Sequence, residues 1–199
     1  MALDAGLIIL DRDGVLNATL PNPNEPRPDS PLRVEAVHVF AWVPSALRRL
    51  TDAGYRLAIA TNQPAFAKGK VSLEELQRVH ARVLSEVSRE GAHISSSHIC
   101  LHRAEDGCEC RKPKPGLLLE ALARHAGHFA GRAWMVGDRA TDVLAGVAAG
   151  VSTALLGDES GRELGELSRS AVRPSFCGAD LRDFSRFLLG QSDASSQDQ

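Results

Sequence analysis

The feature that most constrains the fold is a regular alternation of short apolar runs with segments of helical periodicity. The apolar runs, each followed by polar residues, are 7–10, 56–60, 98–101, 133–137 and 151–156. Segments with helical spacing of apolar residues lie between them, at about 43–53, 72–87, 115–125 and 141–149. Strands that alternate with helices form a parallel sheet covered on both faces. The sequence therefore predicts an α/β fold with a Rossmann-like, doubly wound parallel sheet.

The length and composition fit one domain. The chain has 199 residues, of which 43% are hydrophobic, and a chain of this size can bury one substantial core. We expect a single domain over residues 1–190 with no separate cap domain. Residues 191–199 are polar and have little to bury, so we expect a disordered tail there. Residues 18–33 contain five prolines, which predicts a loop without a helix that covers a site.

Charge and hydropathy exclude some classes of partner. The formal net charge is -2 and the pI is about 6.4, so the chain has no overall basic field to attract nucleic acid or an anionic membrane. It contains no run of about 18 apolar residues that would predict a membrane-spanning helix. We therefore expect a cytoplasmic monomer that binds neither nucleic acid nor a membrane and holds any anionic ligand locally.

Two carboxylates follow the first predicted strand, in the sequence Asp11-Arg-Asp13-Gly. Ligands of open parallel sheets bind beyond the carboxyl ends of the strands. One carboxylate could attack phosphorus while the other moves protons, and a carboxylate nucleophile needs a nearby cation to offset its repulsion from phosphate. The pair thus predicts a phosphoryl-transfer site with a hard metal ion such as magnesium, although short acidic pairs also occur in ordinary turns.

A second acidic pair, Asp138 and Asp142, lies where the fourth predicted strand meets the following helix. Asp138 can bind the metal ion, and Asp142, one helical turn later, can orient the site. The alternative is that both acids favour the helix N-terminus through capping and the helix dipole. This alternative suits Asp142 better than Asp138.

Two further segments offer groups for phosphate. Thr61 and Asn62 end the second predicted strand with a hydroxyl, an amide and backbone N–H groups. Arg111 and Lys112 precede Pro113, which restrains the preceding residue, so the two cations can be aimed at a phosphate. An ordinary turn and a solvated basic pair are the alternatives.

Three of the four cysteines lie close together beside a histidine, as Cys100-x-His102 followed by Cys108-x-Cys110. Four such ligands match a tetrahedral zinc site, and the absence of an open position predicts a structural role in a small zinc-binding loop. The loop directly precedes Arg111, so zinc would order that segment without taking part in the chemistry. Cys177 stands alone and is interpreted as an ordinary residue.

The four segments together resemble the haloacid dehalogenase (HAD) superfamily of phosphatases, over about residues 7–157. Within it, the Cys/His insertion before Arg-Lys-Pro resembles subfamily IIIA, the D-glycero-D-manno-heptose 1,7-bisphosphate phosphatases and their histidinol-phosphatase relatives. The resemblance implies that Asp11 forms an aspartyl-phosphate and that Asp13 protonates the leaving group and then activates water. It also implies that Thr61 and Lys112 stabilise the phosphoryl group, and that Asp11, Asp138 and the Asp13 backbone carbonyl bind magnesium.

Substrate recognition is less closely matched to that family. The resemblance implies that Arg111 contacts the substrate and that Arg139 replaces a lysine that usually lies close to the phosphate. Pro64 and Ala65 replace the usual Ser-Gly after Thr-Asn-Gln, and the loop at residues 18–33 is long and rich in proline. This loop and the zinc loop are expected to form the walls of the substrate pocket.

Three functions follow as hypotheses. The first is hydrolysis of heptose 1,7-bisphosphate to heptose 1-phosphate, through an aspartyl-phosphate. The second keeps the mechanism but makes the substrate histidinol phosphate or another small phosphomonoester. The third is a protein that binds a phosphorylated metabolite without cleaving it, against which the presence of both Asp11 and Asp13 argues.

Overall fold

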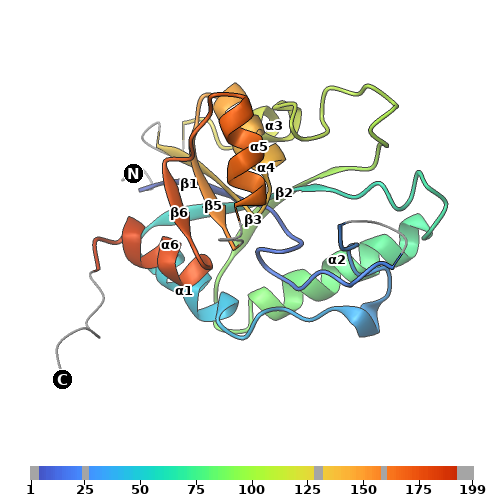
Figure 1. Cartoon of the computed structure of the whole chain (residues 1–199). Helices are drawn as coiled ribbons and strands as arrows, with labels where there is room; N and C mark the ends of the chain where they lie inside the picture. The colour runs from blue at the N-terminus through green and yellow to red at the C-terminus, as the bar shows by residue number, and fades with distance from the viewer. Residues whose placement is uncertain (1–4, 24–26, 128–131, 158–160, 192–199) are drawn as a thin grey trace, which may run out of the picture.

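The computed structural model describes residues 5–23, 27–127, 132–157 and 161–191. They form one six-stranded parallel sheet with the strand order β3-β2-β1-β4-β5-β6 (Figure 1). The strands are β1 (Gly6–Leu10), β2 (Tyr55–Asn62), β3 (Ile94–Cys100), β4 (Ala133–Gly137), β5 (Ser152–Leu156) and β6 (Phe176–Gly178). The predicted α/β fold with a doubly wound parallel sheet is confirmed.

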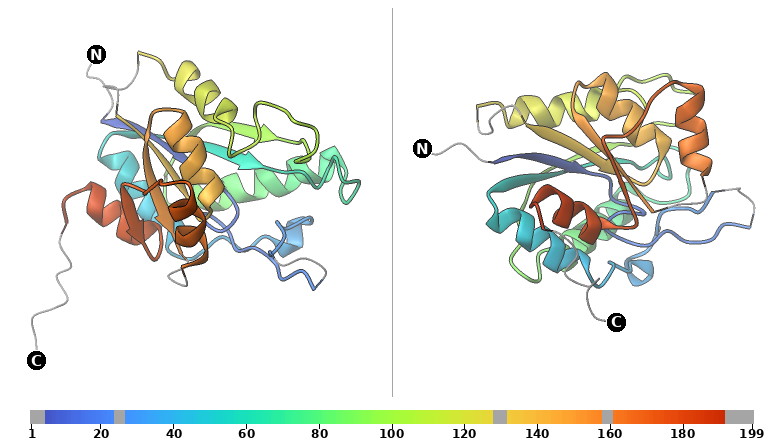
Figure 2. Two further views of the ribbon diagram at one scale, coloured as in Figure 1. Left: turned by 45° about the horizontal axis from the view of Figure 1, so that its top comes forward. Right: turned by 60° about the vertical axis from the view of Figure 1, so that its left-hand side comes forward.

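Helices cover both faces of this sheet. They are α1 (Val43–Asp52), α2 (Leu73–Val87), α3 (Gly116–Arg124), α4 (Ala140–Ala148), α5 (Arg162–Arg169) and α6 (Leu181–Leu188), with a short 3-10 helix η1 (Val34–Ala36). Buried residues of α1, α2 and α6 pack on one face, and those of α3 and α4 pack on the other. The two views of Figure 2 show α1 and α6 on the opposite side of the sheet from α3 and α4.

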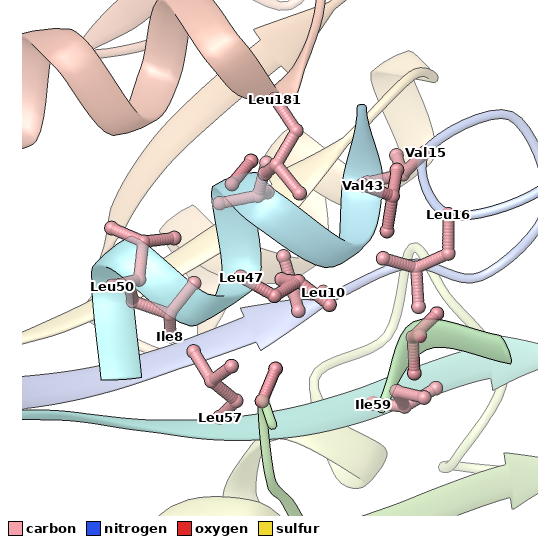
Figure 3. Packing of buried hydrophobic residues seen from close by; sticks show 14 of the residues in the cluster. Ile8, Leu10, Val15, Leu16, Val43, Leu47, Leu50, Leu57, Ile59 and Leu181 are labelled. Atoms are coloured by element: carbon pink, nitrogen blue, oxygen red, sulfur yellow. The ribbon is translucent and has the colours of Figure 1, made fainter. Parts of the chain in front are cut away.

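The alternation of side chains along β1 divides the core into these two layers. Ile8 and Leu10 belong to the same buried cluster as Leu47 of α1, as Figure 3 shows. Leu7 and Ile9 point to the opposite face and join the cluster that includes Leu117 of α3. All four β1 side chains are fully buried, which explains why this strand appears in the sequence as an unbroken apolar run.

The structure extends the predicted order of elements at two places. After β5 it adds α5, β6 and α6, which the sequence patterns had not indicated. β6 has three residues and the two helices have eight each, lengths at which periodicity carries little signal. β3 begins at Ile94, four residues before the predicted apolar run. Its first residues lie at the edge of the sheet and are only half-buried, so the sequence there is not apolar enough to indicate a strand.

Two predictions concern the ends and loops of the chain. The described part of the loop at residues 18–33 contains no helix, as predicted, and its arms are joined by an antiparallel bridge between Leu20 and Asp29. Residues 192–199 lie outside the described residues, so the predicted tail stays a prediction. None of the described helices is both long enough and apolar enough to cross a bilayer.

The C-terminal helix α6, although weakly encoded in the sequence, should be part of the core. Phe184 is fully buried and contacts Trp134 and Phe176 edge-on, whereas Phe187 is 48% exposed. We expect Phe184→Ala to lower the free energy of unfolding by about 3–5 kcal/mol, measured by denaturant titration. The matched control Phe187→Ala should cost about 1 kcal/mol. Equal losses for the two variants would contradict the packing described for α6.

Candidate active site

The carboxyl ends of the three central strands bring the predicted acidic and polar residues together at one edge of the sheet, where a cleft opens. Asp11 follows β1, Thr61 lies near the end of β2, and Asp138 follows β4. β1 lies between β2 and β4, and the backbone N–H of Asp11 donates to the carbonyl of Val136 at 2.8 Å, which extends the pairing of β1 with β4. The cleft has a volume of about 320 Å³. The topology thus brings Asp11, Thr61 and Asp138 together at the carboxyl edge of the sheet, as the sequence predicted.

Three carboxylates form an acidic floor, of which Asp11 and Asp142 line the cleft and Asp138 lies beside them. Oxygens of Asp11, Asp138 and Asp142 lie within 4.8 Å of one another. Asp138 Oδ1 is buried and has no hydrogen-bond partner among the described residues. Burial, together with the negative charges of Asp11 and Asp142, raises the pKa of Asp138 well above its usual value. These possible metal ligands are all oxygen atoms, and one of them has no hydrogen-bond partner among the described residues. Such a set fits a hard divalent cation such as magnesium.

Two glycines allow these acids to approach so closely. Gly14 has a φ of +95°, and a Cβ atom built on it would lie 2.1 Å from Asp138 Oδ2. A Cβ atom on Gly137 would lie 2.2 Å from the carboxylate of Asp142. Any larger residue at either position would displace the acid that it faces.

Lys112 partly balances the negative floor. Its Nζ lies 2.9 Å from Asp11 Oδ1 and 2.6 Å from Asp142 Oδ1, and it donates to the carbonyl of Ala60 at 2.8 Å. Burial would lower the pKa of Lys112, but the charges of Asp11 and Asp142 outweigh it and raise that pKa. For Asp11, burial dominates and raises the pKa to about 6, with Lys112 opposing the shift. The buried ammonium group of Lys112 therefore forms ion pairs with both Asp11 and Asp142.

Asn62 fixes the backbone on which Lys112 is carried. Its side-chain nitrogen donates to the carbonyl of Lys112 at 3.0 Å, and its side-chain oxygen accepts from the N–H of Lys112 at 3.1 Å. Sequence reasoning had assigned Asn62 to substrate binding. Because both ends of its amide bind the protein backbone, the structure gives Asn62 a positioning contact, and any contact with substrate stays a prediction.

Asp13 is held by hydrogen bonds from several directions. Its carboxylate accepts from Arg12 at 2.9 Å, Asn17 at 2.8 Å, Ser30 at 2.9 Å and Gln63 at 2.6 Å. Burial would raise the pKa of Asp13, but Arg12 and the hydrogen bonds from Asn17 and Gln63 lower it below the usual value. Asp13 is therefore presented as an ionised and firmly oriented carboxylate.

Sequence reasoning missed the residues that hold Asp13. Arg12 is fully buried, although an arginine between two aspartates carries no signal that it will point inward. His80 is also buried. Burial and the charge of Arg12 lower the pKa of His80 to about 4, so it packs as a neutral side chain. Gln63 donates to Thr61 Oγ1 at 2.9 Å as well as to Asp13, so it links these two residues of the cleft.

The rim of the cleft is basic. Arg27, Lys68, Arg111 and Arg139 all line it. Arg111 donates to the carbonyl of His102 at 3.2 Å, and Arg139 donates weakly to the carbonyl of Pro28 at 3.5 Å. The structure thus brings the predicted Arg111 and Arg139 to the same opening as Asp11. A larger hollow of about 630 Å³, lined by Arg56 and Arg124 among others, contains no carboxylate among its lining residues and lies apart from these groups.

The four predicted zinc ligands are gathered at one point. Cys110 Sγ lies 3.3 Å from Cys100 Sγ, 3.3 Å from His102 Nδ1 and 3.5 Å from Cys108 Sγ. Ligands bound at about 2.3 Å from a tetrahedral zinc ion would be roughly 3.8 Å apart. Burial and the neighbouring Cys100 and Cys108 raise the pKa of the Cys110 thiol to about 12. This geometry fits a tetrahedral metal ion, whose charge would offset the crowding of thiolates.

Comparisons with known proteins agree with this site. Residues 109–184 match the family model of HAD-hydrolase-like proteins. A Pseudomonas putida protein is 33% identical over 186 residues, which is 92% of this chain and 99% of the relative. A Neisseria meningitidis protein is 32% identical over 198 residues, which is 96% of this chain and 99% of the relative. Both relatives are named D-glycero-beta-D-manno-heptose-1,7-bisphosphate 7-phosphatase.

A solved structure supports the same grouping. The crystal structure of D,D-heptose 1,7-bisphosphate phosphatase from B. bronchiseptica, complexed with magnesium and phosphate, superposes with a TM-score of 0.77. Its sequence identity is 28%, and the match covers 94% of this chain and 99% of that chain. The similarity therefore extends over the whole sheet and the cleft at its carboxyl edge.

The crowded carboxylates should destabilise the metal-free protein. Because the folded-state pKa of Asp138 is raised, its contribution to stability is present at low pH and is lost as pH rises through that pKa. Asparagine carries no charge at any pH. In EDTA, we therefore expect Asp138→Asn to match the wild type near pH 4 and to exceed its free energy of unfolding by about 1–3 kcal/mol near pH 9.

Thermal and denaturant unfolding measure this difference. The control Asp52→Asn alters an exposed acid that pairs with Arg48 and should change stability by less than about 0.5 kcal/mol at either pH. Added magnesium chloride should stabilise the wild type and have little effect on Asp138→Asn. A variant less stable than the wild type in EDTA at high pH would contradict the repulsion described.

Proposed function

Because this chain belongs to the D-glycero-β-D-manno-heptose-1,7-bisphosphate 7-phosphatase family of HAD-like hydrolases, we propose that it removes the 7-phosphate of that sugar bisphosphate and leaves the 1-phosphate. The chain is a phosphatase of this family. The observation that carries the substrate proposal is the pairing of a carboxylate floor around Asp11 with a basic rim at the opening of one cleft. The floor suits phosphoryl transfer, and the rim suits an anionic substrate.

In the first half-reaction Asp11 acts as the nucleophile. Its carboxylate oxygen forms a bond to phosphorus while the bond between phosphorus and the sugar oxygen breaks. Lys112, 2.9 Å from Asp11, and the buried Thr61 hydroxyl bind the transferring phosphoryl group. The departing sugar oxygen takes its proton from Asp13, which avoids release of an alkoxide. This step uses the protonated form of Asp13, which the second half-reaction regenerates, although the lowered pKa of Asp13 favours the ionised form in the free protein.

In the second half-reaction the aspartyl-phosphate is hydrolysed. A water molecule attacks phosphorus and gives its proton to Asp13, and the bond between phosphorus and Asp11 breaks. The hydrogen bonds from Arg12, Asn17 and Gln63 favour the ionised Asp13 that this step requires. Inorganic phosphate and the regenerated Asp11 carboxylate are the products.

Magnesium is the proposed metal at the floor, held by Asp11, Asp138 and the backbone carbonyl of Asp13. When bound, it supplies positive charge that lets an anionic phosphate approach the carboxylates. Asp142 supports the site: it holds Lys112 through one oxygen and accepts from the N–H of Arg139 through the other, at 3.1 Å. Arg111 and Arg139 are proposed to bind the substrate.

Zinc is the proposed metal at the cluster of Cys100, His102, Cys108 and Cys110, where it has a structural role. Cys110 directly precedes Arg111 and lies two residues before Lys112, so a closed metal site would fix the segment that carries both cations. A monomeric state and a cytoplasmic location stay predictions from the sequence.

Phosphate release tests the proposed reaction. We expect magnesium-dependent turnover of the β anomer of heptose 1,7-bisphosphate, favoured because the relatives are named for it, over the α anomer and histidinol phosphate. Asp11→Asn removes the nucleophile and should lower kcat by about a thousandfold or more, whereas the exposed control Asp52→Asn should retain activity. Turnover of histidinol phosphate alone would replace the substrate, and binding without any turnover would identify a non-catalytic binding protein.

Loss of a cluster thiol tests the structural zinc. We expect Cys110→Ser to lose bound zinc, measured by atomic emission, and to lower the free energy of unfolding by roughly 2–5 kcal/mol, as removal of a covalent staple does. Cys177→Ser alters an exposed cysteine outside the cluster and serves as the control, with zinc content and stability unchanged. Unchanged stability and activity after zinc loss would show that the cluster has no structural role.

A further inference from the structure

We infer that Ser30, in the proline-rich loop, is a positioning residue that holds the Asp13 carboxylate in line for proton transfer. The inference rests on the proposed function, because it requires Asp13 to exchange a proton with the substrate. Ser30 Oγ donates to Asp13 Oδ2 at 2.9 Å. Both residues line the cleft, so the contact lies where the substrate would bind.

Ser30 differs from the other partners of Asp13 in where it comes from. Arg12 and Asn17 belong to the turn that contains Asp13, and Gln63 follows the end of β2. These three side chains are at most 2% exposed and are fixed by the core. Ser30 is half-buried and lies in a loop, so its contact forms only when that loop is docked on the cleft.

Ser30 also differs in chemistry. The guanidinium of Arg12 and the amide nitrogens of Asn17 and Gln63 can only donate hydrogen bonds. A hydroxyl can donate to an ionised carboxylate and accept from a protonated one. Asp13 gives up a proton in the first half-reaction and gains one in the second. Because the hydroxyl can rotate, Ser30 can donate to the ionised carboxylate and turn its hydrogen away when Asp13 is protonated, which leaves the proton of Asp13 free for the departing sugar oxygen.

The loop is anchored so that this hydroxyl is held in place. Asp29, the residue before Ser30, forms an ion pair with Lys70 at 3.1 Å and accepts from Asn22 at 2.8 Å. Its backbone N–H and carbonyl pair with those of Leu20. The ion pair with Lys70 fastens the loop to the segment after β2, which carries Gln63, and the contacts with Asn22 and Leu20 join the two arms of the loop.

A second anchor fastens the loop to the other side of the cleft. Arg27 pairs with Glu163 at 3.4 Å and with Glu166 at 3.1 Å, both on α5. Glu163 is 6% exposed and also accepts from the backbone N–H of Ala140, the first residue of α4, at 2.7 Å. The loop is therefore anchored on both sides of the cleft, and Ser30 directly follows the anchoring residues Arg27 and Asp29.

Proton donation matters more for some leaving groups than for others. A sugar oxygen leaves as a strongly basic alkoxide unless it is protonated, whereas p-nitrophenolate is stable enough to leave without a proton. The parameter kcat/KM covers the steps through departure of the leaving group. If Ser30 acts through Asp13, its removal should lower kcat/KM for the sugar phosphate and have little effect on that for p-nitrophenyl phosphate.

The test compares Ser30→Ala, Ser30→Thr and the wild type with magnesium, on heptose 1,7-bisphosphate and p-nitrophenyl phosphate. We expect Ser30→Ala to lower kcat/KM for the sugar about tenfold, with the loss in kcat, and for p-nitrophenyl phosphate by less than about twofold. Ser30→Thr retains a hydroxyl and should recover most of the loss. The control Ser45→Ala removes an exposed hydroxyl on α1 and should behave as the wild type.

A double variant separates action through Asp13 from direct contact with the sugar. In the Asp13→Asn background, Ser30→Ala should cause no further loss with the sugar phosphate. An equal loss on both substrates, a rise in KM alone, or a full additional loss in that background would overturn the inference. If the wild type turns over another alkyl phosphate but not the heptose, the substrate proposal fails, and the same comparison on that ester still decides the role of Ser30.

Discussion

The cleft depends on a balance of charge that the protein leaves incomplete. The oxygens of Asp11, Asp138 and Asp142 lie within 4.8 Å of one another, so their negative charges repel. Lys112 makes short contacts with Asp11 and Asp142. Asp138 has no such contact, and its Oδ1 has no hydrogen-bond partner in the described part of the chain. A cation at this point would complete the balance.

The position of Lys112 in turn depends on residues outside the acidic floor. Asn62 binds the backbone of Lys112 through both its amide atoms. The segment before Lys112 is fixed at the Cys/His cluster, whose member Cys110 lies two residues away. A loop held at both points cannot move its lysine away from Asp11 without breaking one of them. A metal ion bound at the cluster would therefore help to hold the lysine that partly balances the acids of the cleft, although the four residues of the cluster do not line it.

The sequence predicts this fold well where burial dictates residue type. β1 is buried on both faces, so Leu7, Ile8 and Ile9 are all apolar and the strand is recognisable. In β3, Ile94 is followed by three half-buried or exposed serines, and β6 is three residues long. Neither pattern distinguishes a strand from a loop. The start of β3 and the whole of β6 were missed for this reason.

The same reasoning explains which parts of the site were predicted. Asp11 and Asp138 were found because they follow strands whose ends must meet in a parallel sheet. Ser30 reaches Asp13 across 17 residues of loop, and no periodicity encodes the path of such a loop. Arg12 was missed because neither its residue type nor its position in a turn indicates that it is fully buried.

The rim and the floor of the cleft carry different charges, and this difference bears on the substrate. Arg27 is paired with Glu163 and Glu166, so these two carboxylates largely neutralise its charge. Arg111 and Arg139 contact backbone carbonyls, which leave their positive charge available. The floor, in contrast, needs a metal ion before it can accept an anion. A substrate with two phosphates would place one over the floor and direct the other to the rim, whereas a monophosphate would have no second phosphate for the two arginines of the rim.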